Sequence, residues 1–446
     1  MRLFHLGDLH FGKNIHGYSM IEMDDQPFWA EQLLKKAEEL KPDVILISGD
    51  VYDRAVPSKE AVKLFDELLT KISELGIAIC VIAGNHDSGT RLSFGEKLLS
   101  HQNIFIAGEV EKQIKQITLY DVYGPVHFWL VPYLFPAAVN CVLEREDIKD
   151  YDSAMKELLN TADINERERN VILSHQFVIA GSEKPSMGGS ETTVGGIGQI
   201  DANVFSKFDY VALGHIHNAQ RMGKDTVRYA GSPLCYHFSE ANQKKGLTIV
   251  DLQEKGNISI TIEEMPVLHK MCEVSGSLEE ILGYEPEENC YIRAVIKQEV
   301  MPPQAVETLR TYFESKNCVL MEVVRDFSYQ KRNRTMEQTK DVRTVSLEKL
   351  FAEFYHPANK TATIPILFGK VHIPYVESKL RLVCLIRNWI FIYKTNYKGH
   401  KIILHFIAYT WLFLITRKMD IKGYKLYLQS FMDGLVGNFE RHKKFL

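Results

Sequence analysis

The chain has 446 residues, of which 45% are hydrophobic and 25% charged, a composition typical of a soluble globular protein. This length exceeds what one ordinary core supports, so two or three domains are expected. The formal net charge of −4 excludes the strong basic excess by which many nucleic-acid-binding proteins are recognised.

Seven cysteines are scattered along the chain, and none forms a C-x-x-C pair. A zinc site built from thiolates is therefore not expected. The pattern instead predicts a reduced, cytoplasmic protein. The N-terminus has no apolar segment typical of a signal peptide.

Residues 1–262 alternate short apolar runs with amphipathic stretches, which predicts an α/β domain. Helices are expected at Phe28–Leu40 and Ser58–Leu75, and Ser58 is a candidate N-cap. Buried strands are expected at Arg2–Leu6, Val44–Ser48, Ile77–Ala83, Phe128–Pro132, Asn170–Ser174 and Tyr210–Leu213.

Residues 266–330 are expected to form a smaller α+β unit. A capping-box pattern at Ser277–Glu280 predicts one helix start, and a second helix is expected from Pro302-Pro303 to about Lys316. Its strands are expected at His269–Val274, Cys290–Ile296 and Cys318–Val324. Residues 331–363 are a charged linker with a short amphipathic helix at Ser346–Tyr355.

The composition changes abruptly near residue 364. Residues 365–446 hold 14 Lys and Arg against 4 Asp and Glu, whereas the preceding residues hold 39 against 53. The longest apolar stretch of this tail, Ile402–Thr416, is shorter than a membrane span, so no membrane-spanning segment is expected. Three interpretations stay open: a tail contacting nucleic acid or a membrane surface, an ordinary C-terminal segment, and a reading-frame artefact near residue 364.

Five polar motifs begin where predicted strands end. Ligand sites in α/β sheets form at the carboxyl ends of strands, so the five loops are expected to converge on one site. Each motif alone could belong to an ordinary turn or loop, but their joint presence favours a functional site. They are Asp8-Leu-His10, Gly49-Asp50-Val-Tyr-Asp53, Gly84-Asn85-His86-Asp87, His175 and Gly214-His215-Ile-His217.

Two carboxylates, one carboxamide and four imidazoles make seven candidate ligands, too many for one tetrahedral ion but suitable for two ions. Oxygen and imidazole donors without thiolate suit manganese, iron, zinc or cobalt. Asp50 is expected to bridge both ions. Asp8, His10 and His217 would complete one site, and the other would be completed by Asn85, His175 and His215. Such a pair of ions can activate water and stabilise an in-line phosphoryl displacement.

His86 is expected to bind no metal. It would instead protonate the leaving oxygen or stabilise negative charge on a phosphate. Asp87 is a candidate to fix the tautomer of His86, and Asp53 is either a supporting residue of the site or a salt-bridge partner of Arg54.

These motifs resemble the calcineurin-like metallophosphoesterases. Three segments, His5–Lys13, Ala83–Leu92 and Tyr229–Glu240, are similar to segments of the bacterial SbcD nuclease subunits, and the resemblance spans about residues 1–360. It implies a metallophosphoesterase β-sandwich flanked by helices, and it makes residues 266–330 a capping domain.

The resemblance implies a manganese-dependent DNA nuclease that dimerises and works with an SMC-like ATPase, SbcC, in DNA replication and recombination. Implied activities are ATP-dependent 3′→5′ degradation of double-stranded ends and endonucleolytic cleavage of single strands and hairpins. Lys13 and Arg91 are candidate DNA-phosphate contacts or solvated surface charges. The resemblance also implies ATPase-docking helices after the capping domain, and the tail from residue 364 departs from that pattern.

Two other functions use the same residues. One is hydrolysis of a phosphoprotein or small nucleotide, and the other is a non-catalytic scaffold at DNA ends. Degradation of linear DNA with manganese would distinguish a nuclease from a phosphoprotein or nucleotide phosphoesterase. Bound metal in the purified protein would distinguish it from a non-catalytic scaffold.

Overall fold

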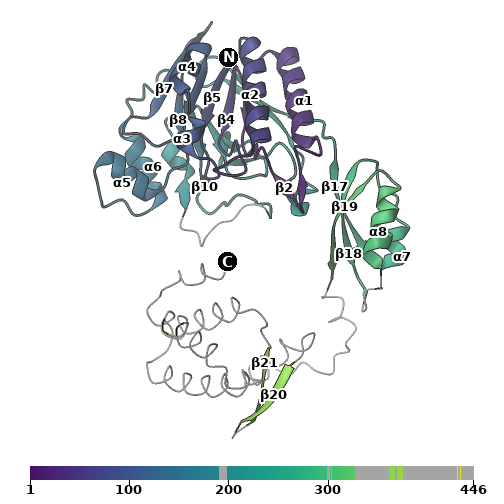
Figure 1. Cartoon of the computed structure of the whole chain (residues 1–446). Helices are drawn as coiled ribbons and strands as arrows, with labels where there is room; N and C mark the ends of the chain where they lie inside the picture. Colours follow the sequence, from purple (N-terminus) through teal and green to yellow (C-terminus); the bar gives the residue numbers. More distant parts are fainter. Residues whose placement is uncertain are drawn as a thin grey trace. The chain divides into compact units, whose positions relative to one another are not determined.

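A computed structural model of the chain describes residues 1–189, 198–298, 302, 304–326, 361–366, 369–374, 429 and 432. The chain divides into two units, Met1–Arg334 and Thr335–Leu446. In the second, β20 (Thr361–Ile366) pairs antiparallel with β21 (Gly369–Pro374) (Figure 1). The predicted helix at Ser346–Tyr355 and the apolar stretch Ile402–Thr416 lie outside the described residues.

Two six-stranded sheets form the centre of the first unit. Their strand orders are β16-β15-β1-β4-β5-β6 and β13-β14-β12-β9-β8-β7. In each sheet four adjacent strands pair in parallel, and the other two strands are joined by antiparallel pairing. The first sheet contains β1 (Arg2–Leu6), β4 (Val44–Ser48), β5 (Ala78–Ile82), β6 (Ile104–Ala107), β15 (Gly246–Leu252) and β16 (Ile258–Glu264). The second contains β7 (Lys115–Asp121), β8 (Gly124–Val131), β9 (Arg169–His175), β12 (Tyr210–Gly214), β13 (Gln220–Met222) and β14 (Lys224–Tyr229).

The two sheets pack face to face, and helices cover their outer faces. Buried residues from both sheets, among them Leu46 and Phe128, form one continuous core between them. Helices α1 (Asp25–Leu40) and α2 (Lys59–Glu74) pack on the first sheet, whereas α5 (Pro136–Leu143) and α6 (Tyr151–Leu159) pack on the second (Figure 1). The predicted β-sandwich flanked by helices is thereby confirmed.

In the sandwich, the six strands that the sequence predicts are largely buried on both faces. All residues of β4 and β5 are buried, as expected for central parallel strands. The antiparallel β7 and β16 were not predicted, because partly exposed positions interrupt their apolar pattern. The side chain of Ser58 accepts a hydrogen bond from the backbone N–H of Ala61, which confirms the predicted N-cap of α2.

A small three-stranded parallel sheet follows the sandwich. It consists of β17 (Lys270–Gly276), β18 (Cys290–Ile296) and β19 (Val319–Arg325) in that order. Helices α7 (Leu278–Leu282) and α8 (Ala305–Glu314) share its core, and both hydrogen bonds of the Ser277 capping box are present. The Tyr291 hydroxyl and His269 Nδ1 both contact the buried carboxylate of Asp25 at the start of α1.

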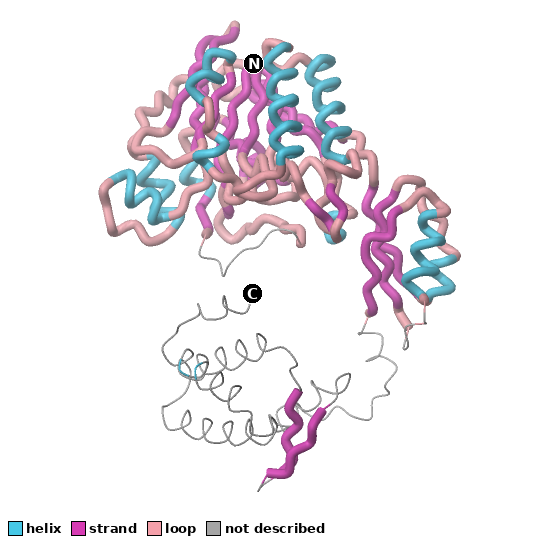
Figure 2. The backbone as a smooth tube through the Cα atoms, in the orientation of Figure 1, coloured by secondary structure: helices cyan, strands magenta, loops and turns pink. Residues whose placement is uncertain are grey.

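The remaining regular elements are short (Figure 2). They are β2 (Asn14–Ile15), β3 (Tyr18–Ser19), β10 (Phe177–Ile179), β11 (Gln199–Asp201), α3 (Gly89–Leu92), α4 (Glu96–Leu99), and the 3₁₀ turns Ser100–Gln102, Ala202–Phe205 and Phe238–Glu240. Within the described residues, no helix is both long and apolar enough to cross a membrane. All six cysteines in this part of the chain are free thiols.

Candidate metal centre

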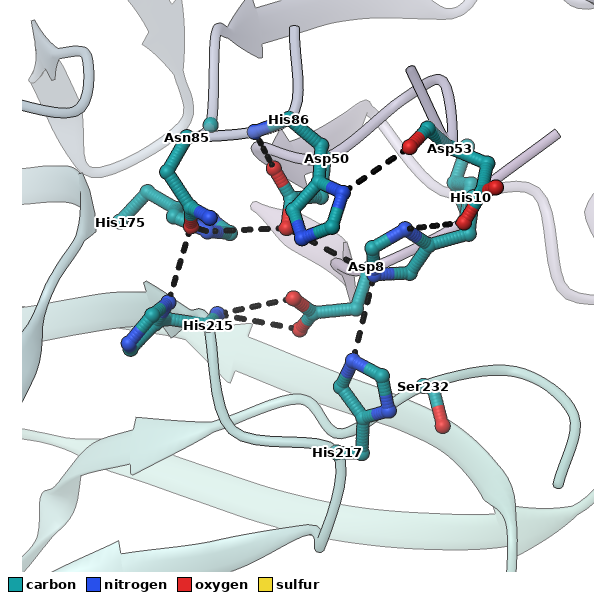
Figure 3. Close-up of polar contacts among 12 residues, drawn as sticks. Asp8, His10, Asp50, Asp53, Asn85, His86, His175, His215, His217 and Ser232 are labelled. Carbon is teal, nitrogen blue, oxygen red and sulfur yellow. Dashed lines mark hydrogen bonds and ion pairs between the residues drawn. The ribbon is translucent and has the colours of Figure 1, made fainter. Parts of the chain in front are cut away.

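The five predicted motifs meet at one edge of the sandwich. The parallel strands β1, β4 and β5 of one sheet and β9 and β12 of the other deliver them from their carboxyl ends. Figure 3 shows the candidate side chains gathered between these loops. Asp8, His10, Asp50, His175 and His217 are all buried.

One group of donors combines Asp8, His10 and His217. Their ligand atoms lie within 4.8 Å of one another, a spacing that allows a single ion to be held. His10 Nε2 is 3.2 Å from His217 Nε2, so the two rings direct these nitrogens at the same point. Both oxygens of Asp8 accept from the backbone N–H of His215, at 2.9 and 3.1 Å, which orients the carboxylate.

A second group surrounds the side-chain oxygen of Asn85. Asn85 Oδ1 lies 3.1 Å from His175 Nε2 and 3.0 Å from His215 Nδ1. The other nitrogen of His175, Nδ1, lies 2.7 Å from the carbonyl oxygen of Ser48. Because that carbonyl is only an acceptor, Nδ1 carries a proton, and Nε2 is the atom that would bind a metal after losing its own proton.

Asp50 lies between the two groups. Its Oδ2 is 3.5 Å from His10 Nε2 and 3.3 Å from His175 Nε2. Its Oδ1 accepts from the backbone N–H of His86 at 2.9 Å. One carboxylate therefore faces histidines of both groups, which is the position that a bridging ligand requires.

Burial and neighbouring charges shift the pKa values in this cluster in opposite directions. Burial raises the pKa of Asp8 to about 6. Although burial also acts on Asp50, the charge and hydrogen bond of His175 hold the pKa of Asp50 well below its usual range. Burial and the positive charge of His175 lower the pKa of His215 to about 3. Buried carboxylates and imidazoles this close are costly without a compensating charge, and divalent cations would supply one.

His86 lies against the first group. Its Nδ1 is 2.9 Å from the carbonyl oxygen of Asp53, and its ring packs edge-on to His10 with centroids 4.8 Å apart. His86, His10 and Asp50 also form a set of donors close enough to hold an ion. Position alone therefore does not separate His86 from the ligands.

The structure differs from the expectation for Asp87. The Asp87 carboxylate accepts from the backbone N–H groups of Gly84, Val51 and Tyr52 at 2.9 to 3.1 Å. It thereby ties the loop after β5 to the loop after β4. The contact to the ring of His86 comes from the Asp53 backbone instead, because the loop turns the Asp87 side chain towards these amides.

Asp53 and Lys13 form an ion pair beside His10. Lys13 Nζ is 2.7 Å from Asp53 Oδ1, and the same oxygen is 3.7 Å from His10 Nδ1. Arg54 Nε lies 3.6 Å from the other oxygen. Arg91, on α3, is exposed. Asp53 therefore fits both roles that the sequence left open, because it contacts His10 of the site and also pairs with Arg54.

The backbone of the site is strained. Asp8, His10, Asp50 and His215 have φ angles of 54, 44, 49 and 99°, a left-handed region that non-glycine residues rarely adopt. Strain of this kind persists where surrounding structure enforces it, and it clusters at functional sites. Gly84 permits the close approach of Asp50, since a Cβ built on Gly84 would lie 2.1 Å from Asp50 Oδ1.

Sequence reasoning missed a layer of residues behind His217. Glu240, Lys245 and Ser232 are buried there and connected by hydrogen bonds. Glu240 lies in the segment Tyr229–Glu240, which resembles the family, but the pattern of this segment does not indicate a role for the residue. Lys245 follows another lysine in a polar stretch, which predicts a surface charge and conceals its burial.

Comparison with known proteins agrees with this geometry. Residues 1–219 match the family model for calcineurin-like phosphoesterases, and residues 267–358 match the model described as type 5 capsule protein repressor C-terminal domain. A curated relative, the SbcD component of the nuclease SbcCD from Staphylococcus epidermidis, is 31% identical over 289 residues, covering 63% of this chain and 74% of the relative.

Two solved structures are more distant. A dimetal phosphatase from Danio rerio is 11% identical with a TM-score of 0.34, covering 59% of this chain and 96% of its own. A protein from Thermus thermophilus has the same identity and TM-score, covering 58% and 98%. The two family models match consecutive parts of the chain, and the curated relative is similar over 63% of it. The His and Asp clusters that fit a dimetal site include residues of the first matched region. The chain belongs to the SbcD family of nuclease subunits, within the calcineurin-like phosphoesterases.

Proposed function

We propose that this protein is a metal-dependent DNA nuclease that hydrolyses phosphodiester bonds at the centre described above. The observation that carries the proposal is the position of Asp50, whose Oδ2 lies within 3.5 Å of a histidine nitrogen from each group. A nucleic acid as the substrate is supported by the relationship to a nuclease subunit, and DNA is what the family resemblance implies.

The donors divide between two ions, with Asp50 shared. Asp8, His10 and His217 would hold one ion, and the other would be held by Asn85, His175 and His215. Manganese is the proposed metal because the family resemblance implies it, and a donor set of hard oxygen and imidazole without thiolate is compatible with it. When bound, such ions activate water and stabilise charge on the phosphate.

The remaining site residues act around these ligands. His86, as the imidazolium, would donate its Nε2 proton to the leaving oxygen and become neutral, while its Nδ1–H stays on the Asp53 carbonyl and holds the ring. Asp53 supports His10, and Asp87 holds the two loops together. Lys13 and Arg91 are proposed to contact DNA phosphates.

We further propose that the protein acts as a homodimer with an SMC-like ATPase, SbcC, in the cytoplasm. Under this proposal it degrades double-stranded ends 3′→5′ with ATP and cuts single strands and hairpins, in DNA replication and recombination. The name of the curated relative, a subunit of the SbcCD nuclease, supports the partner. Residues 1–262 form the nuclease domain, 266–330 the capping domain and 331–363 the start of the ATPase-docking segment, whereas the tail 364–446 is given no role.

The proposal is tested with end-labelled linear DNA and manganese, with and without ATP and an SbcC-type partner. His86→Ala is expected to keep its metal but lose cleavage by about 10²–10⁴-fold, the usual contribution of a general acid. His101→Ala, which alters an exposed histidine outside the site, is the matched control and should cleave normally. Activity confined to a small phosphate ester would favour the alternative phosphoesterase, and failure to bind manganese would favour the scaffold.

A further inference from the structure

The imidazole of His217 has a carboxylate on the side away from the metal centre. His217 Nε2 faces His10, whereas His217 Nδ1 lies 3.4 Å from Glu240 Oε1. The side chains of His217 and Glu240 are 5% and 0% exposed, so no bulk water competes for this contact. The two nitrogens of the ring therefore have separate surroundings, one in the cluster of ligands and one against a buried anion.

Lys245 holds Glu240 in this position. Lys245 Nζ lies 2.9 Å from Glu240 Oε2, and it also donates to the carbonyl oxygen of His217 and to Ser232 Oγ, each at 2.8 Å. A fourth contact, of 3.0 Å, joins it to Gln243 Oε1. The Lys245 side chain is only 5% exposed. The ammonium group thus fixes both the backbone of His217 and the carboxylate behind its ring.

Such an arrangement has a chemical consequence for a metal ligand. A carboxylate accepts a hydrogen bond and donates none, so Nδ1 of His217 carries the proton and Nε2 keeps its lone pair. An anionic acceptor also makes the imidazole a stronger donor to a metal. His175, in the other group of donors, has the neutral carbonyl of Ser48 in this place. The two proposed ions are therefore supported unequally.

We propose that Glu240 and Lys245 are positioning residues that orient His217. They would selectively strengthen the binding of the ion that Asp8, His10 and His217 would hold. The inference rests on the proposed ligand role of His217. A buried ion pair far from any ligand would contribute only to stability, and replacing one partner of such a pair is strongly destabilising. Metal affinity, measured ion by ion, distinguishes the two roles.

The test is a manganese titration of the metal-free full-length protein by calorimetry, with the melting temperature recorded for every variant. Glu240→Gln preserves the shape of the side chain and removes its charge. It is expected to weaken one of the two binding steps by about 10–100-fold, the usual cost of losing such a partner, and to leave the other within about twofold. Lys245→Met should weaken the same step.

Two controls separate positioning from stability. Arg169→Met breaks a largely buried ion pair with Asp121, and the two side chains are 4% and 13% exposed. It should lower the melting temperature and leave both affinities unchanged. The double variant Glu240→Gln/Lys245→Met leaves no unpaired buried charge, so it should melt higher than either single variant and still show the weakened step.

The possible outcomes separate this inference from the proposed function. Wild-type affinity at both steps in every Glu240 and Lys245 variant overturns the inference, as does an equal loss at both steps that follows the fall in melting temperature. A wild-type protein that binds two manganese ions and cleaves DNA keeps the proposed function in either case. If the wild-type protein binds no manganese, that result contradicts both the proposed function and this inference.

Discussion

The buried histidine His5 makes the stability of the sandwich depend on pH. His5 lies on β1, is fully buried, and its Nδ1 is 2.9 Å from the hydroxyl of Tyr210 on β12 of the opposite sheet. Burial, together with the positive charge of Arg228, lowers the pKa of His5 to about 3. The folded protein therefore keeps His5 neutral at pH values where the unfolded chain protonates it.

The sign and the size of the effect follow from linkage. The contribution is fully present above the unfolded pKa of about 6.5 and is lost as the pH falls towards 3, because only the unfolded state takes up the proton in that window. Between pH 7 and pH 5 the loss is about 2 kcal/mol for this single group.

The measurement is urea unfolding of the metal-free protein at pH 7 and pH 5, for the wild type and for His5→Leu. The fall in unfolding free energy between these pH values should be about 2 kcal/mol larger in the wild type, whatever the absolute stability of the variant. Tyr210→Phe retains the buried imidazole and should retain the pH dependence. Equal pH dependence in the wild type and His5→Leu would refute the reasoning.

Three further substitutions test other contacts. Gly84→Ala places a methyl group 2.1 Å from Asp50 Oδ1, so manganese affinity, measured by calorimetry, should fall by at least about tenfold; unchanged affinity would show that Asp50 need not hold its position. Arg169→Met removes the guanidinium partner of the Asp121 carboxylate, which keeps the N-terminal ammonium of Met1, and should cost about 1.5–3 kcal/mol in urea unfolding. A loss below about 1 kcal/mol would mean that solvent screens the pair. Ser277→Ala removes the capping box of α7 and should lower the unfolding free energy of the small α+β unit by about 1 kcal/mol, with Ser277→Thr as the control that keeps the cap.

The fold class and the kind of chemistry were accessible from the sequence because both depend on local patterns. The six strands predicted within residues 1–262 are present in the structure, since a strand buried on both faces must be apolar at nearly every position. The donor types were equally visible, since the preference of a metal for imidazole and carboxylate follows from the side chains themselves. Strand-end positions then predicted that Asp8, Asp50 and His175 would meet.

Other features depend on contacts between residues far apart in the chain, and these only the tertiary structure decided. Asp50 reaches His175 across 125 positions, which no local pattern encodes. The loop after β5 turns Asp87 towards backbone amides, so the ring of His86 is held by the Asp53 carbonyl instead.

The same division explains why Glu240 and Lys245 were missed as supports of His217. A glutamate and a lysine in a polar stretch predict solvent exposure, because burying either charge alone is unfavourable. Folding offsets that cost by placing each charge against the other and both against His217. The sequence by itself determined which atoms are available to bind metal, and the tertiary structure decided which of them are held in place to do so.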